Sequence, residues 1–156
     1  MNENLRGKEL SIAIGSDHAG YPLKEQLVDL LRAEGYNLQD FGAFSVERVD
    51  YPDVAREVAE AVAAGHYDRA ILICGTGIGM TMTANKVKGI RAAACSEPYS
   101  AKMARAHNNA NVLGVGGRVV GAGLALDIAT TFMETEFEFG SRHERRVDKI
   151  NAMDER

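Results

Sequence analysis

The 156-residue sequence contains no tryptophan, only two cysteines and only three prolines. Its apolar runs are all shorter than the roughly 20 residues that a membrane helix needs. The polar segment from Met1 to Glu9 lacks the apolar stretch of a signal peptide, and we expect residues 1–10 to be a loose leader. Secreted domains held by disulfides are usually smaller and richer in cysteine. The sequence therefore predicts a cytoplasmic protein with reduced thiols and no membrane partner.

An excess of one charge sign is also missing, because the formal net charge is only -4. Such a chain has no general attraction to nucleic acid or to an anionic membrane, so an anionic ligand needs a local group of cations. No linker rich in proline or serine divides the chain, and its length suits one domain that needs no disulfide or metal staple. We expect a single domain over residues 1–156.

Short apolar runs alternate with helical stripes along the chain. The run from Ala70 to Cys74 is almost wholly apolar, as expected of a central parallel strand covered on both faces. The leucines between positions 23 and 31 form a helical stripe that Gly35 ends. By the same reasoning we expect strands at residues 11–15, 37–41, 70–74, 91–95 and 111–115, and helices at 21–34, 53–64, 76–86, 98–107, 122–134 and about 142–155.

Five strands that alternate with helices across short connections predict an α/β fold. The expected form is a three-layer α/β/α sandwich around a Rossmann-like, five-stranded parallel sheet. Ligands of such folds bind beyond the carboxyl ends of the strands. The segments of interest are therefore those that follow the strands, at residues 16–18, 74–79, 96–99 and 114–118.

The segment that begins at Cys74 combines a thiol with a glycine-rich turn. Glycines at positions 75, 77 and 79 follow the buried strand and lead into a helix. Backbone N–H groups of such a turn can stabilise a developing oxyanion, by roughly 2.7–4 kcal/mol each, and can favour a thiolate. The spacing differs from the dinucleotide fingerprint G-x-G-x-x-G. A tight turn with an inert buried cysteine explains the segment equally well.

Two further polar segments have both a chemical and a structural explanation. Asp17 and His18 follow the first strand, where they suit acid–base chemistry or sugar hydroxyls, or form an Asx-type cap. His107 and Asn108 end a helix, where the helix dipole alone stabilises a histidine cation. Taken separately, the structural explanation is favoured for each segment.

Arginines near the end of the chain suggest a phosphate site. Arg142 and Arg146 lie four residues apart on one helix face, which suits a phosphate, although a solvated charged face is the commoner meaning. Arg118 follows two glycines and is either a third phosphate ligand or part of a surface ion pair. The four histidines lack the spacing of metal ligands, so we expect no metal and no other cofactor.

Several stretches occur together in a fixed order between Ile12 and Ile150. They are GSDHAG at 15–20, DYP at 50–52, ICGTGIG at 73–79, ANK at 84–86, GIRA at 89–92, CSEPYSA at 95–101, HN at 107–108, RVVG at 118–121 and GSRHERR at 140–146. In this combination the sequence closely resembles the ribose-5-phosphate isomerase B family, which is grouped with the galactose-6-phosphate isomerases. Each stretch alone has a simple structural explanation, but their joint occurrence is highly specific.

The resemblance implies an aldose–ketose isomerase that interconverts ribose 5-phosphate and ribulose 5-phosphate through a cis-enediol. Cys74 would be the base, Thr76 would assist proton exchange between the two oxygens, and Asp17 and His107 would open the cyclic sugar. The other implied contacts are Tyr51 and Asn108 to the substrate, the backbone of Gly75, Gly77, Ile78 and Gly79 to the enediolate, and His18, Arg118, Arg142 and Arg146 to the phosphate.

The resemblance also implies a homodimer, or a tetramer, whose sites are built from both subunits. The partner would supply the equivalents of His107, Asn108 and Arg118. Asn109 stands where aspartate is common, and residues 113–117 are richer in glycine than expected, which weakens the choice of sugar more than the reaction class. The alternatives are the same chemistry on allose 6-phosphate, galactose 6-phosphate or a tetrose 4-phosphate, and a non-catalytic phosphosugar-binding module.

Overall fold

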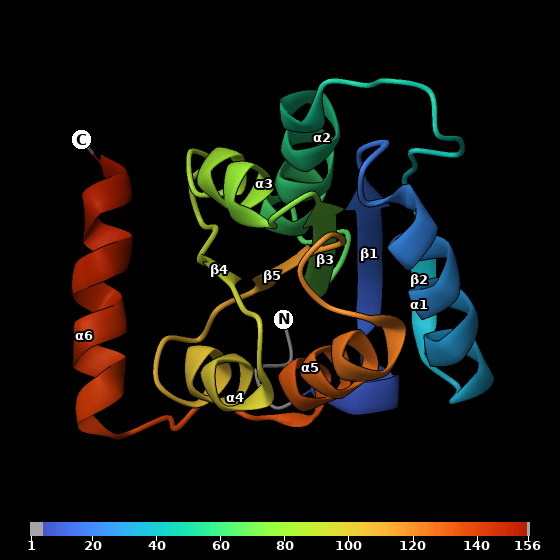
Figure 1. Ribbon diagram of the computed structural model, residues 1–156. Helices are drawn as coiled ribbons and strands as arrows, with labels where there is room; N and C mark the ends of the chain where they lie inside the picture. Colours follow the sequence, from blue (N-terminus) through green and yellow to red (C-terminus); the bar gives the residue numbers. More distant parts are fainter. Residues whose placement is uncertain (1–4, 156) are drawn as a thin grey trace.

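Figure 1 shows the computed structural model, which describes residues 5–155. The strands are β1 (Ser11–Ser16), β2 (Asn37–Asp40), β3 (Arg69–Cys74), β4 (Ala92–Ala94) and β5 (Val112–Gly116). The helices are α1 (Tyr21–Ala33), α2 (Tyr51–Ala63), α3 (Ile78–Ala84), α4 (Pro98–Ala106), α5 (Ala122–Glu134) and α6 (Arg142–Asn151), with 3-10 helices at Gly7–Glu9 and Ala152–Glu155.

All five strands form one parallel sheet in the order β2-β1-β3-β5-β4. The central strand β3 is fully buried and pairs with β1 and β5, so that Ile71 lies between Ile14 and Leu113. The connections between the strands are helices, as parallel pairing requires. The expected α/β fold with a five-stranded parallel sheet is confirmed.

Alternating side chains divide the core between the two faces of the sheet. On β1, Ile12 and Ile14 pack in the larger apolar cluster, which includes residues of α1, α4 and α5. Ala13 belongs to the smaller cluster, which α2 and α3 complete. The smaller residues on the second face allow α2 and α3 to lie close to the strands, and this face carries the Cys74 loop.

The structure departs from several of the expected element bounds, and three of these departures have a clear local cause. Helix α2 begins at Tyr51 rather than at Asp53, because Pro52 is tolerated in the first turn of a helix. Helix α3 is shorter than expected, since residues 75–77 form a turn. Residues 5–10, expected to be loose, are ordered around a 3-10 helix, and Leu10 is 2% exposed in the core. Residues 1–4 of that segment lie outside the described residues.

Helix α6 stands away from the three layers (Figure 1). It is reached by an extended segment after α5, and only His143 and Val147 of its residues are buried. Its arginines Arg142 and Arg146 are exposed. From residue 5 to residue 155, no helix has the length and apolar character that crossing a membrane requires.

Candidate functional site

The carboxyl ends of β1 and β3 bring Asp17 beside the strand that carries Cys74. The Asp17 backbone N–H donates to the Ile73 carbonyl oxygen at 3.2 Å. The buried Asp17 carboxylate accepts a hydrogen bond from the Gly20 N–H at 2.9 Å, and a side chain at position 20 would collide with the Ile73 carbonyl. The sequence therefore fixes this carboxylate at the strand-end edge, as expected from its place after the first strand.

Cys74 ends β3 at the base of the glycine turn. Its residue is 4% exposed and packs in the cluster on the α2–α3 face. The sulfur accepts a hydrogen bond from the Gly77 N–H at 3.2 Å. Gly77 has φ +80°, a left-handed conformation that glycine adopts without strain. The exposed Thr76 hydroxyl accepts a hydrogen bond from the Ile78 N–H at 3.2 Å. The Cys74 sulfur and the Thr76 hydroxyl are therefore both hydrogen-bonded to backbone N–H groups of one turn.

The glycines of β5, which are more numerous than expected, allow this turn to pack directly against the strand. An added Cβ at Gly114 would collide with the Thr81 hydroxyl oxygen and lie 2.8 Å from the Gly77 carbonyl oxygen. At Gly116 it would lie 2.9 Å from the Thr76 carbonyl oxygen. Thr81 in turn donates its hydroxyl to the Gly77 carbonyl at 2.6 Å. The turn can therefore occupy this position only because these residues of β5 have no side chain.

A cleft of about 490 Å³ opens beside this edge of the sheet. Tyr51 lies on its wall at the start of α2, and a Cβ at Gly79 would be 2.8 Å from the Tyr51 ring. His18 is held by the Val49 N–H, which donates to its Nδ1 at 3.3 Å. Arg48 and Val49 also line the cleft; they belong to an irregular segment whose path no periodicity in the sequence reveals.

Arg118 lies beside the Cys74 turn of its own chain. Its N–H donates to the Gly75 carbonyl at 3.0 Å, and a Cβ on Gly75 would be 3.8 Å from the Arg118 guanidinium. The resemblance implied that this arginine comes from a partner subunit. The structure places the exposed guanidinium within reach of the turn without a partner, because the Gly116–Gly117 turn brings the chain back over β3.

The structure does not bring His107 to Cys74. His107 follows α4, which runs antiparallel to the strands, so it lies near their amino ends, whereas Cys74 lies at a carboxyl end. Its ring stacks on His143 of α6 with centroids 3.8 Å apart and an interplanar angle of 9°. Arg142 is the neighbour of His143, and Asn108 is exposed beside His107. These residues form a second group on the far edge.

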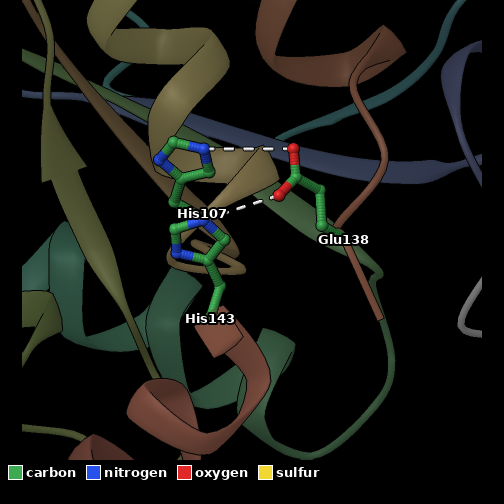
Figure 2. Close-up of side chains that lie close together, drawn as sticks. All are labelled: His107, Glu138 and His143. Carbon is green, nitrogen blue, oxygen red and sulfur yellow. Dashed lines mark ion pairs between the residues drawn. The ribbon is translucent and has the colours of Figure 1, made fainter. Parts of the chain in front are cut away.

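Glu138 joins the two stacked histidines, as Figure 2 shows. Its carboxylate oxygens lie 3.9 Å from His107 Nε2 and 3.5 Å from His143 Nε2. Burial, with the nearby His107 and Arg142 as further causes, lowers the pKa of His143. The neutral imidazole is therefore favoured there, and Glu138 holds both rings in place.

The same three side chains are of types that bind metal ions, and their ligand atoms lie within 4.8 Å of one another. The sequence missed this group because the fold, rather than the spacing of the histidines, brings the side chains together. The carboxylate already lies beside both imidazoles, so contacts among the three side chains themselves are enough to explain the cluster.

The two thiols differ in their surroundings. Cys95 lies before α4, and its sulfur faces the Ala93 carbonyl oxygen at 3.9 Å. Burial, with a smaller contribution from Glu97, raises the pKa of the Cys95 thiol to about 11. Cys74 instead has a backbone N–H directed at its sulfur. Only Cys74 combines a donor with a place at the strand-end edge.

Comparison with known proteins supports the resemblance seen in the sequence. The family described as Ribose/Galactose Isomerase matches residues 12–150. Ribose-5-phosphate isomerase B of Escherichia coli K12 is 50% identical over 145 residues, which cover 93% of this chain and 97% of that protein. D-erythrulose-4-phosphate isomerase of Pectobacterium atrosepticum is 46% identical over 142 residues, covering 90% and 93%.

A solved structure shows the same fold. Ribose-5-phosphate isomerase B of Clostridium thermocellum superposes with a TM-score of 0.90 at 53% identity, over 93% of this chain and 97% of that one. The match includes both edges of the sheet, since it covers nearly all of both chains. The chain therefore belongs to the ribose/galactose isomerase family.

Proposed function

We propose that this protein interconverts ribose 5-phosphate and ribulose 5-phosphate with Cys74 as the base. The observation that carries the proposal is the sulfur of Cys74 at the end of β3, held by the Gly77 N–H beneath a glycine turn. The 50% identity with a ribose-5-phosphate isomerase B supports the choice of substrate.

In the proposed reaction the Cys74 thiolate removes the proton from C2 of the open-chain aldose and returns it to C1. The electron pair left at C2 forms the C1=C2 double bond while the carbonyl π pair moves onto the C1 oxygen, which gives the cis-enediolate. Backbone N–H groups of the turn from Gly75 to Gly79 stabilise this oxyanion, and the Thr76 hydroxyl relays the proton between the two oxygens. A positioned base contributes typically 10²–10⁴-fold to such a step.

The remaining roles are divided between the two edges of the sheet. Asp17 contacts the ring oxygens, Tyr51 and His18 border the cleft, and Arg118 supplies a cation at the turn. Binding of a remote phosphate by arginines orients C1 and C2 over the sulfur. Arg142, Arg146, His107 and Asn108 lie at the far edge, so one chain alone does not assemble the full set.

We propose that a second copy of the chain completes each site. Helix α6 stands apart from its own layers (Figure 1). A groove of about 800 Å³ lies between it and the β4 edge. Exposed apolar side chains at Ile78, Met82 and Tyr99, each more than half exposed, give a further surface for a partner. In this homodimer His107 and Asn108 of one subunit reach Cys74 of the other.

A mixing experiment tests the shared site. Cys74→Ala and His107→Ala subunits, each inactive alone, are unfolded together, refolded and assayed. If sites are shared, half of the dimers are mixed and each has one intact site, so activity returns to about a quarter of wild type. No recovery would show that each site lies within one subunit.

The base assignment is tested by Cys74→Ala with Cys95→Ala as the matched control. The first substitution is expected to lower kcat by at least about 10²-fold while phosphosugar binding persists, and the second to leave kcat near wild type. Turnover by Cys74→Ala near the wild-type rate would refute the base. Absence of turnover in the wild type, with binding retained, would favour a non-catalytic phosphosugar-binding module.

A second substrate is favoured by one relative. Because the D-erythrulose-4-phosphate isomerase is 46% identical to this chain, a tetrose 4-phosphate is the main alternative, with galactose 6-phosphate and allose 6-phosphate next. The kcat/KM values for four-, five- and six-carbon phosphates decide among them. A higher value for a tetrose or hexose phosphate would reject ribose 5-phosphate as the preferred substrate.

A further inference from the structure

A second cavity lies at the opposite edge of the sheet from Cys74. It has a volume of about 260 Å³ and opens beyond the amino ends of the strands. Arg69, the first residue of β3, lines it, whereas Cys74 is the last residue of that strand. At roughly 3.3 Å per residue, the two edges are about 16 Å apart. The cavity therefore lies apart from the Cys74 half of the proposed isomerase site, and its wall residue Asn109 directly follows the far-edge residues His107 and Asn108.

Three arginines converge on this cavity from different elements. Arg69 begins β3, Arg91 precedes β4 and Arg105 lies on α4. Arg69 and Arg105 are each 4% exposed, and Arg91 is half-buried. Arginine is rarely this buried unless it is paired. Three such side chains around one small cavity therefore call for an explanation.

The hydrogen bonds of these arginines all go to uncharged acceptors. Arg69 donates to the carbonyls of Phe132, Met133 and Leu5. Arg105 donates through Nε and Nη1 to Thr135, Asn109 and Ala110, which leaves Nη2. Arg91 donates through Nε and Nη1 to Asn109 and Asn151 and also keeps Nη2. These partners accept hydrogen bonds from part of each guanidinium group, and none of them carries a negative charge.

Carboxylates act on these cations only from beyond ion-pair distance, Asp68 and Glu134 on Arg69 and Asp154 on Arg91. Over residues 5–155, none of the three forms an ion pair within 4.0 Å. Asp68, which lines the cavity, accepts the Ser11 N–H at 2.8 Å. Burial, with the neighbouring Arg69 and Arg91 as further causes, lowers the pKa of Arg105 to about 9. The cavity therefore holds positive charge in a place where charge is costly.

Asn109 lies where a negatively charged side chain would balance the charge of the arginines. Its Oδ1 accepts from Arg105 Nη1 at 2.9 Å, and its carbonyl accepts from Arg91 Nε at 2.9 Å. Its backbone has φ +47°, which asparagine and aspartate tolerate better than other side chains. An amide here makes the hydrogen bonds but leaves the charges unbalanced.

We propose that this cavity binds a small phosphate-type oxyanion between Arg69, Arg91 and Arg105. Guanidinium groups match the geometry of phosphate oxygens, and a bound anion supplies the missing counter-charge. The cavity is smaller than the roughly 300–1,000 Å³ of most ligand pockets, which suits inorganic phosphate or a small phosphorylated metabolite. Binding there stabilises the fold, because the unfolded chain has no such site.

The test uses inorganic phosphate and the Arg142→Ala/Arg146→Ala background, which removes two of the four expected phosphate contacts of the proposed isomerase site. Nitrogen-15 spectra follow the Nε–H signals of the three cavity arginines during a phosphate titration, and circular dichroism follows Tm. We expect saturable shifts of these signals and a rise in Tm. Sodium chloride at matched ionic strength is expected to produce neither effect.

Asn109→Asp provides the matched variant, because it replaces the amide by a carboxylate of the same shape. We expect a higher Tm without phosphate and a phosphate affinity weakened by about tenfold or more, since an internal anion now balances the arginines. The proposal is overturned if phosphate shifts no arginine signal, if chloride acts equally, or if Asn109→Asp leaves the affinity unchanged. Loss of isomerase activity in any variant does not bear on it.

Discussion

The contact between β5 and the Cys74 turn leads to a sharp prediction for Gly114→Ala. The new methyl group would collide with the Thr81 hydroxyl and lie 2.8 Å from the Gly77 carbonyl oxygen. Both neighbours are fixed, because Thr81 donates its hydroxyl to that same carbonyl at 2.6 Å. The strain must therefore be relieved by movement of the turn whose N–H group holds the Cys74 sulfur.

The expected magnitude follows from the cost of overpacking. Adding a methyl group to a well-packed core destabilises by about 1–3 kcal/mol. For a chain of this length each kcal/mol lowers Tm by about 2–4 °C, so a fall of several degrees is expected. Because displacement of a reacting group by about 1 Å can cost 10²-fold, kcat should fall much more than stability alone would suggest.

Calorimetry and steady-state kinetics measure the two effects. Gly123→Ala is the matched control, since an added Cβ there has no neighbour within 4 Å, and it should leave Tm and kcat nearly unchanged. Adding Thr81→Ala to Gly114→Ala should restore part of the lost stability, because one of the two close contacts is removed. Wild-type kcat and Tm in Gly114→Ala would refute the reasoning that a bare β5 backbone positions the turn.

Three other predictions concern the thiols, the pH dependence of stability and a buried ion pair. Iodoacetamide at about pH 8 should alkylate Cys74 and spare Cys95, whose raised pKa keeps it protonated; mass spectrometry locates the label. Because the pKa of His143 is lowered in the fold, the stability it contributes should be lost as the pH falls below about 6.5, and chemical denaturation of His143→Gln should show less pH dependence. Lys24→Met should destabilise by about 3 kcal/mol, as the buried ammonium pairs with Asp40 at 2.6 Å.

Each of these predictions has a clear contrary result. Labelling of Cys95 at a rate equal to that of Cys74 would contradict the first. An unchanged pH profile in His143→Gln would show that another group titrates. Urea unfolding of Lys24→Met at the wild-type midpoint would show that the ion pair contributes nothing to stability.

The sequence predicted the fold well because its signals were local. The apolar run before Cys74 and the leucine stripe of α1 each specify one element, and the parallel sheet follows from their alternation. The position of Asp17 at the strand-end edge also followed from order along the chain. Local periodicity was sufficient wherever a residue's place depends on its own element.

Contacts between distant segments could not be predicted in this way. The pairing of Gly114 with Thr81, the stacking of His107 on His143 and the gathering of three arginines in one cavity all depend on how elements meet. Spacing along the chain excluded a histidine cluster that the fold in fact assembles. The placement of Arg118 beside its own Gly75 likewise required the three-dimensional turn.

The glycines of β5 limit the ways in which mutations can change the substrate preference of this protein. Gly114 and Gly116 lie against the Cys74 turn and accept no larger residue without displacing the turn that holds the Cys74 sulfur. A change of preferred sugar length is therefore expected to come from the wall of the cleft, where Arg48 and Val49 of an irregular segment and Tyr51 at the start of α2 present replaceable side chains. Redesign of specificity in this protein should begin at that wall.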